Sequence, residues 1–451
     1  METKTRNRAA LIAATGVPLA LLAARRRRAP HRAQATGDRR ASVVVAGAGF
    51  GGIAVLNALR NAGLDGADIL LIDQHNYHLF TPLLYQVATG SVDDQHIAYP
   101  LRPFCAGVPA EFLCTTIRGV NLVDQVVETD AGRIRYDYLV LALGSQTNYF
   151  GMHEVEREAL GLKTIPAASS IRARIIDSVE RAAVASDPEE RRWLLTFAVV
   201  GAGATGVELV ASLDDLLRNN LLPYYPSLRG EEPRIVLIEA MDTILPGTTP
   251  RMRAIAERRL KDLGIDIRLK TAVAGVRNGA LVTRAGDEIA AATLIWTAGI
   301  RPNPVAASLP VEKSRDGRIV VDEYLRIPSA PNVFALGDNA FVPDQNSGAP
   351  LPANASVAVR EGAAVGRNLV RLLTGHPLEP FVFRSPGEMI ALGRGHAAAT
   401  IGPVAFGGLP AWLVWRVFHL SQIMGVRSRV GVTLDWTAAL LSRRYIANTE
   451  V

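Results

Sequence analysis

Short, wholly apolar runs alternate along the chain with longer runs in which apolar residues recur every three or four positions. Such short runs are typical of strands buried in a parallel sheet, and the longer ones of helices that cover it. One strand–helix–strand unit spans residues 42–73, and a second spans residues 196–239. Each unit is followed by an apolar strand that ends in glycine, at residues 138–144 and 293–299. The repeat predicts an α/β fold with two domains of related build.

The C-terminal part of the chain has a different pattern. Residues 409–424 are rich in aromatic side chains, and residues 433–446 carry apolar residues at helical spacing. Arginines flank both runs, and neither run reaches the roughly 20 residues that span a bilayer. Short apolar helices with tryptophan and a rim of arginine are typical of a membrane interface. A buried helical hairpin or a dimer interface is the alternative interpretation.

The charge of the chain is concentrated at its N-terminus. Residues 1–40 hold ten basic and two acidic residues, a charge of +8, whereas the other 411 residues carry 39 basic and 41 acidic residues, a charge of −2. Nothing in this near-neutral body indicates a nucleic-acid surface. Residues 9–24 form an apolar run before four arginines, which allows a signal-like or membrane-surface segment. A disordered extension, or a start codon placed too early, is the alternative.

Only two cysteines occur, Cys105 and Cys114. This number fits a reducing compartment and offers no disulfide framework, and we expect two buried free thiols. No closely spaced cysteine pair follows the first glycine-rich turn, which weighs against a disulfide reductase. A sulfide-oxidising quinone reductase, which needs reactive cysteines, is also disfavoured. No metal site is expected.

Both strand–helix turns contain three glycines at the spacing of a dinucleotide-binding fingerprint. In such a turn the first glycine permits the sharp bend, the second lets the backbone approach a pyrophosphate, and the third lets the helix pack on the sheet. The pyrophosphate then meets the helix N-terminus. Two such turns indicate a protein that passes electrons between a flavin (FAD) and a nicotinamide (NADH). The glycines are Gly47, Gly49 and Gly52 in the first turn and Gly201, Gly203 and Gly206 in the second.

An acidic residue ends the second strand of each unit, Asp73 in the first and Glu239 in the second. Such an acid binds a ribose 2′-hydroxyl and repels a 2′-phosphate, so Glu239 favours NADH over NADPH. Solvated strand ends are the alternative interpretation of both acids. The interval before Glu239 is longer than usual, and we attribute this to an inserted loop at residues 219–232.

A later apolar strand, residues 332–338, ends in Gly337 and Asp338. Its position predicts a return of the chain to the first domain, where Asp338 would reach the ribityl or pyrophosphate region of the flavin. A turn aspartate is the alternative.

The segment after Asp73, which reads DQHNYHLFTPLLYQVATG from residue 73 to residue 90, resembles the type II NADH dehydrogenases. Members of that family are single-chain, monotopic flavoproteins that pass electrons from NADH to a membrane quinone without pumping protons. The resemblance covers about residues 41–446. It implies that Thr81 and Pro82 contact the flavin. It further implies cofactor contacts at Gly144, Gly299, Gly337 and Asp338.

The same resemblance implies a role for Glu208, which follows the second glycine turn. The family has an acid there that lies near the nicotinamide and is implicated in coupling protons to quinone reduction; an acid that merely favours a helix start is the alternative. One departure concerns the quinone pocket, where the family has a helix start Ala-Gln-x-x-x-Gln. The two glutamine positions are Ser356 and Arg360 here. A permanent cation therefore replaces a neutral amide.

These observations predict two Rossmann-like dinucleotide-binding domains, for FAD and NAD, and a C-terminal helical region that associates with a membrane. We expect a peripheral (monotopic) protein on the cytoplasmic face of the cell membrane, and a homodimer is compatible with the pattern. A soluble NADH:acceptor flavin reductase and a non-catalytic redox-sensing flavoprotein are the alternatives. The expected boundaries are an N-terminal extension at 1–40, the FAD-binding domain at 41–165 and 313–385, the NADH-binding domain at 166–312, and the C-terminal region at 386–451.

Overall fold

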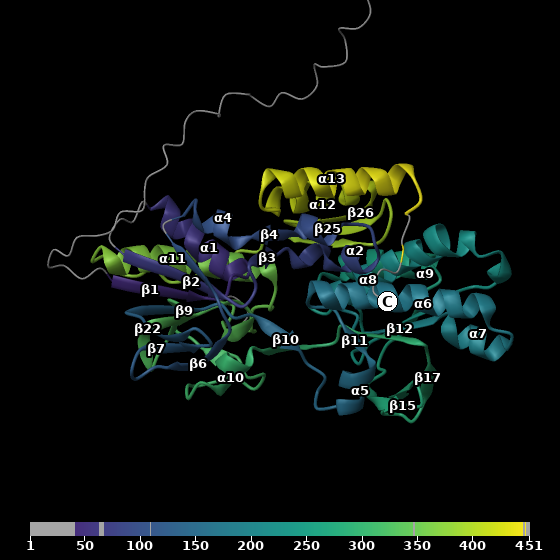
Figure 1. Ribbon diagram of the computed structural model, residues 1–451, viewed down its shortest axis with the longest axis horizontal. Helices are drawn as coiled ribbons and strands as arrows, with labels where there is room; N and C mark the ends of the chain where they lie inside the picture. The colour runs from purple at the N-terminus through teal and green to yellow at the C-terminus, as the bar shows by residue number, and fades with distance from the viewer. Residues whose placement is uncertain (1–40, 63–66, 109, 346–347, 445–446, 448–451) are drawn as a thin grey trace, which may run out of the picture. The chain divides into compact units, whose positions relative to one another are not determined.

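The computed structural model describes residues 41–62, 67–108, 110–345, 348–444 and 447, and the N-terminal extension at 1–40 lies outside the described residues (Figure 1). The first sheet has six strands in the order β21-β22-β9-β1-β2-β5. All neighbours pair in parallel except β21 with β22. The late strand β22 therefore lies beside β9, in the sheet that β1 opens. The strands are β1 (Ala41–Ala46), β2 (Ala67–Asp73), β5 (Glu111–Cys114), β9 (Tyr138–Leu141), β21 (Arg326–Ile327) and β22 (Ala330–Ala335).

Two helices, α1 (Phe50–Asn61) and α11 (Ala355–Leu373), pack closely against each other beside this sheet (Figure 1). Their approach depends on small residues, since a Cβ at Gly362 would lie only 2.2 Å from the Gly51 carbonyl oxygen. The side chain of Asn354 caps the N-terminus of α11. Other elements of this part are β3 (Tyr77–Leu79), β4 (Ala98–Pro100), α3 (Asp94–Ile97), α4 (Leu101–Cys105), β6 (Ile117–Asn121), β7 (Val126–Thr129), β8 (Gly132–Arg135), α10 (Pro304–Ser308), β20 (Ile319–Val320) and β23 (Ala340–Phe341).

The second sheet has five parallel strands in the order β11-β18-β12-β13-β14. Its central strand β12 is wholly buried, as its unbroken apolar run predicts. A small antiparallel sheet of β15, β16 and β17 lies between β14 and β18 in the chain, as β6, β7 and β8 lie between β5 and β9 of the first sheet. The elements are β11 (Leu160–Gly161), β12 (Thr196–Val200), β13 (Arg234–Ile238), β14 (Asp266–Arg268), β15 (Val273–Arg277), β16 (Ala280–Thr283), β17 (Glu288–Ala290), β18 (Thr293–Trp296), α5 (His153–Glu158), α6 (Ile165–Val184), α7 (Pro188–Leu194), α8 (Ala204–Asp215) and α9 (Pro250–Asp262).

The inserted loop expected at residues 219–232 is wrong in part. Helix α8 continues into a π-helical segment, η2 (Leu216–Leu221), and two 3₁₀ turns follow, η3 (Leu222–Tyr224) and η4 (Pro226–Leu228). The physical reason is burial, because leucines along the segment are buried in the larger hydrophobic core and favour helical turns over an open loop. These leucines are Leu216, Leu217, Leu221 and Leu228.

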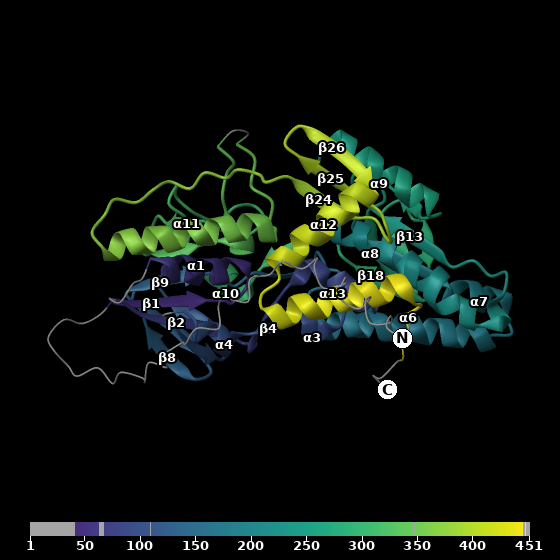
Figure 2. The same cartoon turned by 90° about the horizontal axis from the view of Figure 1, so that it is seen from above.

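The C-terminal region begins with a three-stranded antiparallel sheet, and two helices follow it (Figure 2). Helix α12 packs on the sheet, and α13 packs on α12 and on α3. The elements are β24 (Glu388–Ala391), β25 (Ala397–Ile401), β26 (Val404–Gly408), α12 (Leu409–Gln422) and α13 (Val426–Leu441).

These two helices have one buried face and one exposed apolar face. Trp415 and Trp436 are 1% and 5% exposed. Large apolar side chains on the same helices are open to solvent: Leu413, Val417, Phe418, Leu434 and Leu441. Within the described residues, the helices are all too short or too polar to cross a membrane.

Candidate functional site

The first glycines of the two fingerprints occupy equivalent turns. Gly47 and Gly201 both have φ of +103°, a conformation that L side chains rarely adopt. Each donates its backbone N–H to the last apolar residue of the neighbouring strand, at 2.8 Å in both turns. A Cβ would lie 2.2 Å from the Ala142 carbonyl oxygen in the first turn and 2.6 Å from the Ala298 nitrogen in the second. Only glycine fits either position.

The third glycines hold the helices against the turns. A Cβ at Gly52 would lie 1.9 Å from the Gly47 carbonyl oxygen, and a Cβ at Gly206 would lie 1.9 Å from the Gly201 carbonyl oxygen. The first turns of α1 and α8 can therefore pack closely against the turns that precede them. This is the packing role that the spacing predicts.

The middle glycines face open space, as a turn that binds a dinucleotide requires. A Cβ at Gly49 or Gly203 would meet no atom of the described residues within 4 Å. Each glycine is the N-cap of its helix, and no side chain caps either helix. The uncapped amides are the donors that a pyrophosphate needs. Both turns therefore fit a dinucleotide.

The two strand-end acids are held by their own glycine turns. Asp73 accepts the backbone N–H of Ala48 at 2.7 Å, and Glu239 accepts that of Ala202 at 2.7 Å. Each acid also accepts a second backbone N–H two residues further along the chain, at 2.8 Å for Asp73 and 3.0 Å for Glu239. Two sites so far apart in sequence thus share their hydrogen-bond pattern. Both carboxylates lie at the turn where a nucleotide ribose would be recognised.

The segment that carries Thr81 and Pro82 is tied to the first glycine turn. His78 is buried, and its Nδ1 lies 2.9 Å from the Ala48 carbonyl oxygen. Its ring makes an edge contact with Phe50, with ring centroids 4.9 Å apart. Thr81 is exposed and Pro82 half-buried in η1 (Thr81–Leu83), which leads into α2 (Leu84–Ala88).

Gly144 and Gly299 each precede one strand of a short antiparallel pair, β10 (Ser145–Thr147) and β19 (Ile300–Pro302), so they lie at opposite ends of that pair. Gly144 has φ of +70°, and Gly299 has φ of +76°. The Gly299 carbonyl accepts the backbone N–H of Asn148 at 3.3 Å. The glycine ends of the two sheets are thus linked.

Asp338 is the end of a chain of three polar side chains. The hydroxyl of Ser145 donates to Asp338 Oδ2 at 2.5 Å, and Lys163 Nζ donates to the same hydroxyl at 3.0 Å. Burial lowers the pKa of Lys163, and the charge of Asp338 opposes this. Asp338 also lines a cavity of about 220 Å³, beside Arg318 and Leu351. An open space edged by this carboxylate fits a polar part of a cofactor.

Glu361 lies behind the Gly337–Asp338 turn. It is 1% exposed, and it accepts the backbone N–H of Gly337 at 2.6 Å. Burial raises its pKa to about 7. Sequence reasoning missed both Glu361 and Lys163. The adjacent Arg360 of α11 drew attention to this helix, but no local pattern links Lys163 to Asp338.

Glu208 lies on α8 and reaches the C-terminal region. Its Oε1 accepts the backbone N–H of Ala391 at 3.1 Å. Burial raises the pKa of Glu208 to about 8, although the Ala391 amide and the Trp415 indole lower it. Burial also raises the pKa of Tyr85, and the charge of Glu208 adds to that rise. A carboxyl that keeps its proton at neutral pH can donate it.

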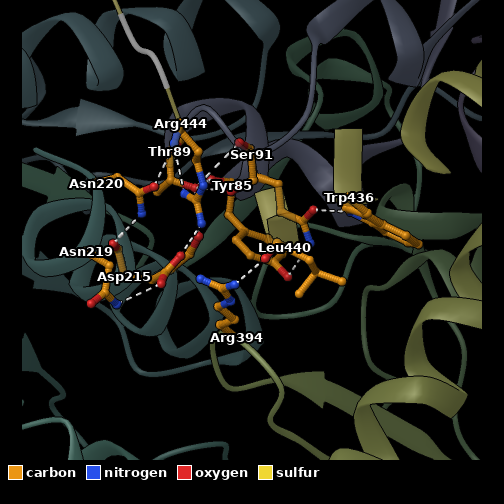
Figure 3. Close-up of polar contacts among 12 residues, drawn as sticks. Tyr85, Thr89, Ser91, Asp215, Asn219, Asn220, Arg394, Trp436, Leu440 and Arg444 are labelled. Atoms are coloured by element: carbon orange, nitrogen blue, oxygen red, sulfur yellow. Dashed lines mark hydrogen bonds and ion pairs between the residues drawn. The ribbon is translucent and has the colours of Figure 1, made fainter. Parts of the chain in front are cut away.

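A buried hydrogen-bond chain continues from Tyr85 (Figure 3). Gln86 Nε2 donates to the Tyr85 hydroxyl at 2.9 Å, and Trp436 Nε1 donates to Gln86 Oε1 at 2.7 Å. Helix α13 is thereby joined to α2.

Ser356 and Arg360 contact each other on the first turns of α11. Arg360 Nη1 donates to both the backbone carbonyl and the hydroxyl of Ser356, at 2.9 Å each. The guanidinium carbon also lies 5.9 Å from the centre of the Phe383 ring. The cation at the second glutamine position is thus folded back onto its own helix.

The expectation of two buried thiols is wrong for one of them. Cys105 is buried, whereas Cys114 is exposed, because it ends the edge strand β5. Both are free. Among the residues in the described ranges, no cluster of histidine, cysteine or acidic side chains could hold a metal ion.

Comparisons with known proteins agree with this geometry. Residues 41–362 match the family model described as pyridine nucleotide-disulphide oxidoreductase. The chain is 35% identical over 422 residues to the type II NADH:quinone oxidoreductase Ndh of Mycobacterium tuberculosis, covering 90% of this chain and 89% of that protein. It is 30% identical to a probable NADH dehydrogenase of Dictyostelium discoideum, covering 90% and 91%. The structure of NDH2 from Plasmodium falciparum in complex with NADH has the same fold, with a TM-score of 0.83, 20% identity and coverage of 90% and 99%.

Proposed function

The chain belongs to the pyridine nucleotide-disulphide oxidoreductase family and, within it, to the type II NADH:quinone oxidoreductases, and we propose that it oxidises NADH through FAD and passes two electrons to a membrane quinone. The observation that supports this most directly is the pair of equivalent glycine turns, each with its own strand-end acid. One chain with two dinucleotide sites can bring a flavin and a nicotinamide together.

The residues divide between the two cofactors. The turn at Gly47–Gly52 and Asp73 would hold FAD, with Thr81, Pro82, Gly144, Gly337 and Asp338 around it. The turn at Gly201–Gly206 and Glu239 would hold NADH, with Gly299 beside it. A bound flavin would supply the hydride acceptor for NADH and the two-electron donor for the quinone. The chain contributes position, exclusion of water and protons.

Glu208 is our candidate for the proton supply. A quinone needs two protons with its two electrons, and the pKa of Glu208 is raised to about 8 by burial. At neutral pH the group is therefore largely protonated and can act as an acid. Glu208 lies on α8, and its hydrogen bond from the Ala391 amide links this helix to the C-terminal region.

The quinone end of the site differs from the family pattern at Ser356 and Arg360. We propose that these two residues still border the acceptor site, with the Arg360 cation fixed by Ser356. The membrane surface is the proposed partner of α12 and α13, because their outer faces expose apolar side chains. The cytoplasmic face, the homodimer and the domain boundaries stay predictions.

Steady-state NADH oxidation with a panel of quinones and water-soluble acceptors tests the proposal. We expect membrane quinones to be reduced with the highest kcat/KM, and NADH to be preferred over NADPH. Turnover with dyes or oxygen but with no quinone would favour the soluble acceptor reductase. Flavin that NADH fails to bleach in a stopped-flow trace would favour the non-catalytic flavoprotein.

A further inference from the structure

A cavity lies where α2 and α8 meet the C-terminal helices. Its volume is about 60 Å³, and it is lined by both aromatic and cationic side chains. Figure 3 shows Tyr85, Asp215, Arg394 and Arg444 around this region. Trp412 and Arg416 also line the cavity. The space is of the order of one small polyatomic ion.

Arg416 has no anionic partner among the described residues. Its guanidinium carbon lies 3.8 Å from the ring centre of Trp412 and 4.7 Å from that of Trp436. Its Nε is buried with no hydrogen-bond partner. Across the described part of the chain, no hydrogen bond or ion pair reaches this guanidinium. Burial lowers its pKa to about 10, so it stays charged at neutral pH. The side chain as a whole is partly buried. A charge partly withdrawn from water gains from an opposite charge, so the cavity beside Arg416 favours an anionic ligand.

The neighbouring charges do not supply that partner. Asp215 forms an ion pair with Arg444, which also donates to the Thr89 carbonyl at 3.0 Å. Arg394 donates to the backbone carbonyl of Leu440 at 2.6 Å. Glu208, whose charge acts on Tyr85, has a pKa raised to about 8 and is therefore largely uncharged at neutral pH. The cavity therefore has a net positive charge at neutral pH, and it suits an anion.

The surroundings indicate which anion. The planar fork of an arginine matches the oxygens of a phosphate. Leu440 lines the cavity and is 37% exposed, so the polar pocket opens beside the apolar outer face of α13. Leu413 and Val417 extend that apolar surface on α12. A ligand with a phosphate and acyl chains matches both features, whereas free phosphate matches only the first.

We propose that this cavity is a subsite for the phosphate headgroup of an anionic phospholipid, with the guanidinium of Arg416, stacked between Trp412 and Trp436, as its principal contact. The subsite would seat α12 and α13 at the membrane surface. It goes beyond the proposed electron transfer, because it assigns a lipid ligand to residues that do not touch NADH or quinone in that proposal.

Vesicle binding by the flavin-loaded full chain tests this subsite. Vesicles of phosphatidylcholine, with and without phosphatidylglycerol, are titrated while tryptophan emission is recorded, since two tryptophans stack on the guanidinium. We expect a saturable change with phosphatidylglycerol at much lower lipid concentration than with phosphatidylcholine alone. In Arg416→Met the half-saturating phosphatidylglycerol concentration should rise on the order of tenfold, with phosphatidylcholine binding unchanged.

Arg427→Met is the matched control, because Arg427 is exposed on α13 and its loss removes one general surface charge. In this variant the half-saturating phosphatidylglycerol concentration should rise by at most about fivefold. Equal losses in the two variants would overturn the subsite. If inorganic phosphate alone gave the same saturable change, and Arg416→Met abolished it, the anion chemistry would stand but the lipid source would be overturned.

A folding check keeps the comparison valid. Arg416→Met should retain its flavin absorbance and melting temperature. If it does not, Arg416→Lys replaces it, because lysine keeps the charge but has no planar fork. Reduced phosphatidylglycerol affinity in Arg416→Lys would support the guanidinium contact, and wild-type affinity would overturn it.

Discussion

Single acidic side chains in this protein occupy two kinds of surroundings. Asp73 and Glu239 each accept two backbone N–H groups from the turns beside them. Among the described residues, one backbone N–H, that of Ala391, donates to Glu208, and burial raises its pKa to about 8. The first arrangement suits recognition by a fixed carboxylate, and the second suits the proposed role of a proton donor. The two kinds of acid should therefore respond differently to substitution.

Glu208→Gln should slow quinone reduction by roughly 10²-fold, since an amide cannot give up a proton as an acid does. Reduction of the flavin by NADH should change little, and FAD should stay bound. Stopped-flow measurement of the two half-reactions separates these effects. Equal slowing of both would refute the role of Glu208 as a proton relay.

The pH profile gives a second test of the same group. Below its raised pKa Glu208 is protonated and can donate, and above about pH 8 it is charged and cannot. The rate of quinone reduction in the wild type should therefore fall as the pH rises through about 8. The slower Glu208→Gln enzyme should lack this step. A step of the same size in the variant would point to another group.

Glu239→Gln should shift the ratio of kcat/KM for NADPH over NADH upward by roughly tenfold or more, because a like charge no longer faces the 2′-phosphate. Steady-state kinetics with both nucleotides measures this. Asp242→Asn is the control, since it removes one exposed charge three residues away. If both variants shift selectivity equally, only the general charge of the loop matters.

At the scale of elements, the two helix starts are built alike. Helices α1 and α8 each begin at an open glycine and press a second glycine against the turn. The third glycine of each turn therefore serves helix packing, whereas the middle glycine would leave room for a bound nucleotide. An alanine at Gly206 would place its Cβ 1.9 Å from the Gly201 carbonyl oxygen, whereas one at Gly203 would meet nothing within 4 Å in the part of the chain that the structure describes.

Gly206→Ala should destabilise the protein by about 1–3 kcal/mol, because the backbone of α8 must move away from the strand. The melting temperature of this variant should fall by several degrees. Gly203→Ala should melt close to the wild type but show a raised KM for NADH, since its methyl occupies the space for the pyrophosphate. A lowered melting temperature and unchanged KM in Gly203→Ala would contradict this division.

At the scale of the whole molecule, the C-terminal helices are joined to the nucleotide-binding core. Trp436 bonds Gln86, and Asp435 lies 2.6 Å from the Nδ1 of His96. The opposite faces of α12 and α13 expose large apolar side chains. Each of these two helices therefore packs on the rest of the protein through one face and exposes apolar side chains on the other.

This arrangement predicts how the protein leaves membranes. Washing with high salt should leave most of it in the pellet, because apolar burial is not screened by ions, and detergent should release it. Immunoblots of the washed fractions measure this. Release by salt alone would favour a surface that binds only through charge.

Sequence reasoning reached the parts of the site that depend on neighbours in the chain. The roles of Gly47 and Gly201 as turn glycines follow from spacing, and their shared φ of +103° agrees with that. Lys163 could not be found in this way, since it meets Ser145 and Asp338 only after the chain folds. The helical turns at residues 219–232 were missed because prolines and polar residues obscured the leucine pattern.

By itself the sequence determined the two strand–helix–strand units, their glycine turns and the acids that end their second strands, because each depends on residue spacing within one unit. Only the tertiary structure decided which distant groups meet. Glu208 contacts Ala391 across 183 positions, and Arg416 lies between two tryptophans of different helices. Burial, and the pKa values that follow from it, depend on such distant contacts, so the raised pKa of Glu208 and the surroundings of Arg416 could not be seen in a linear pattern.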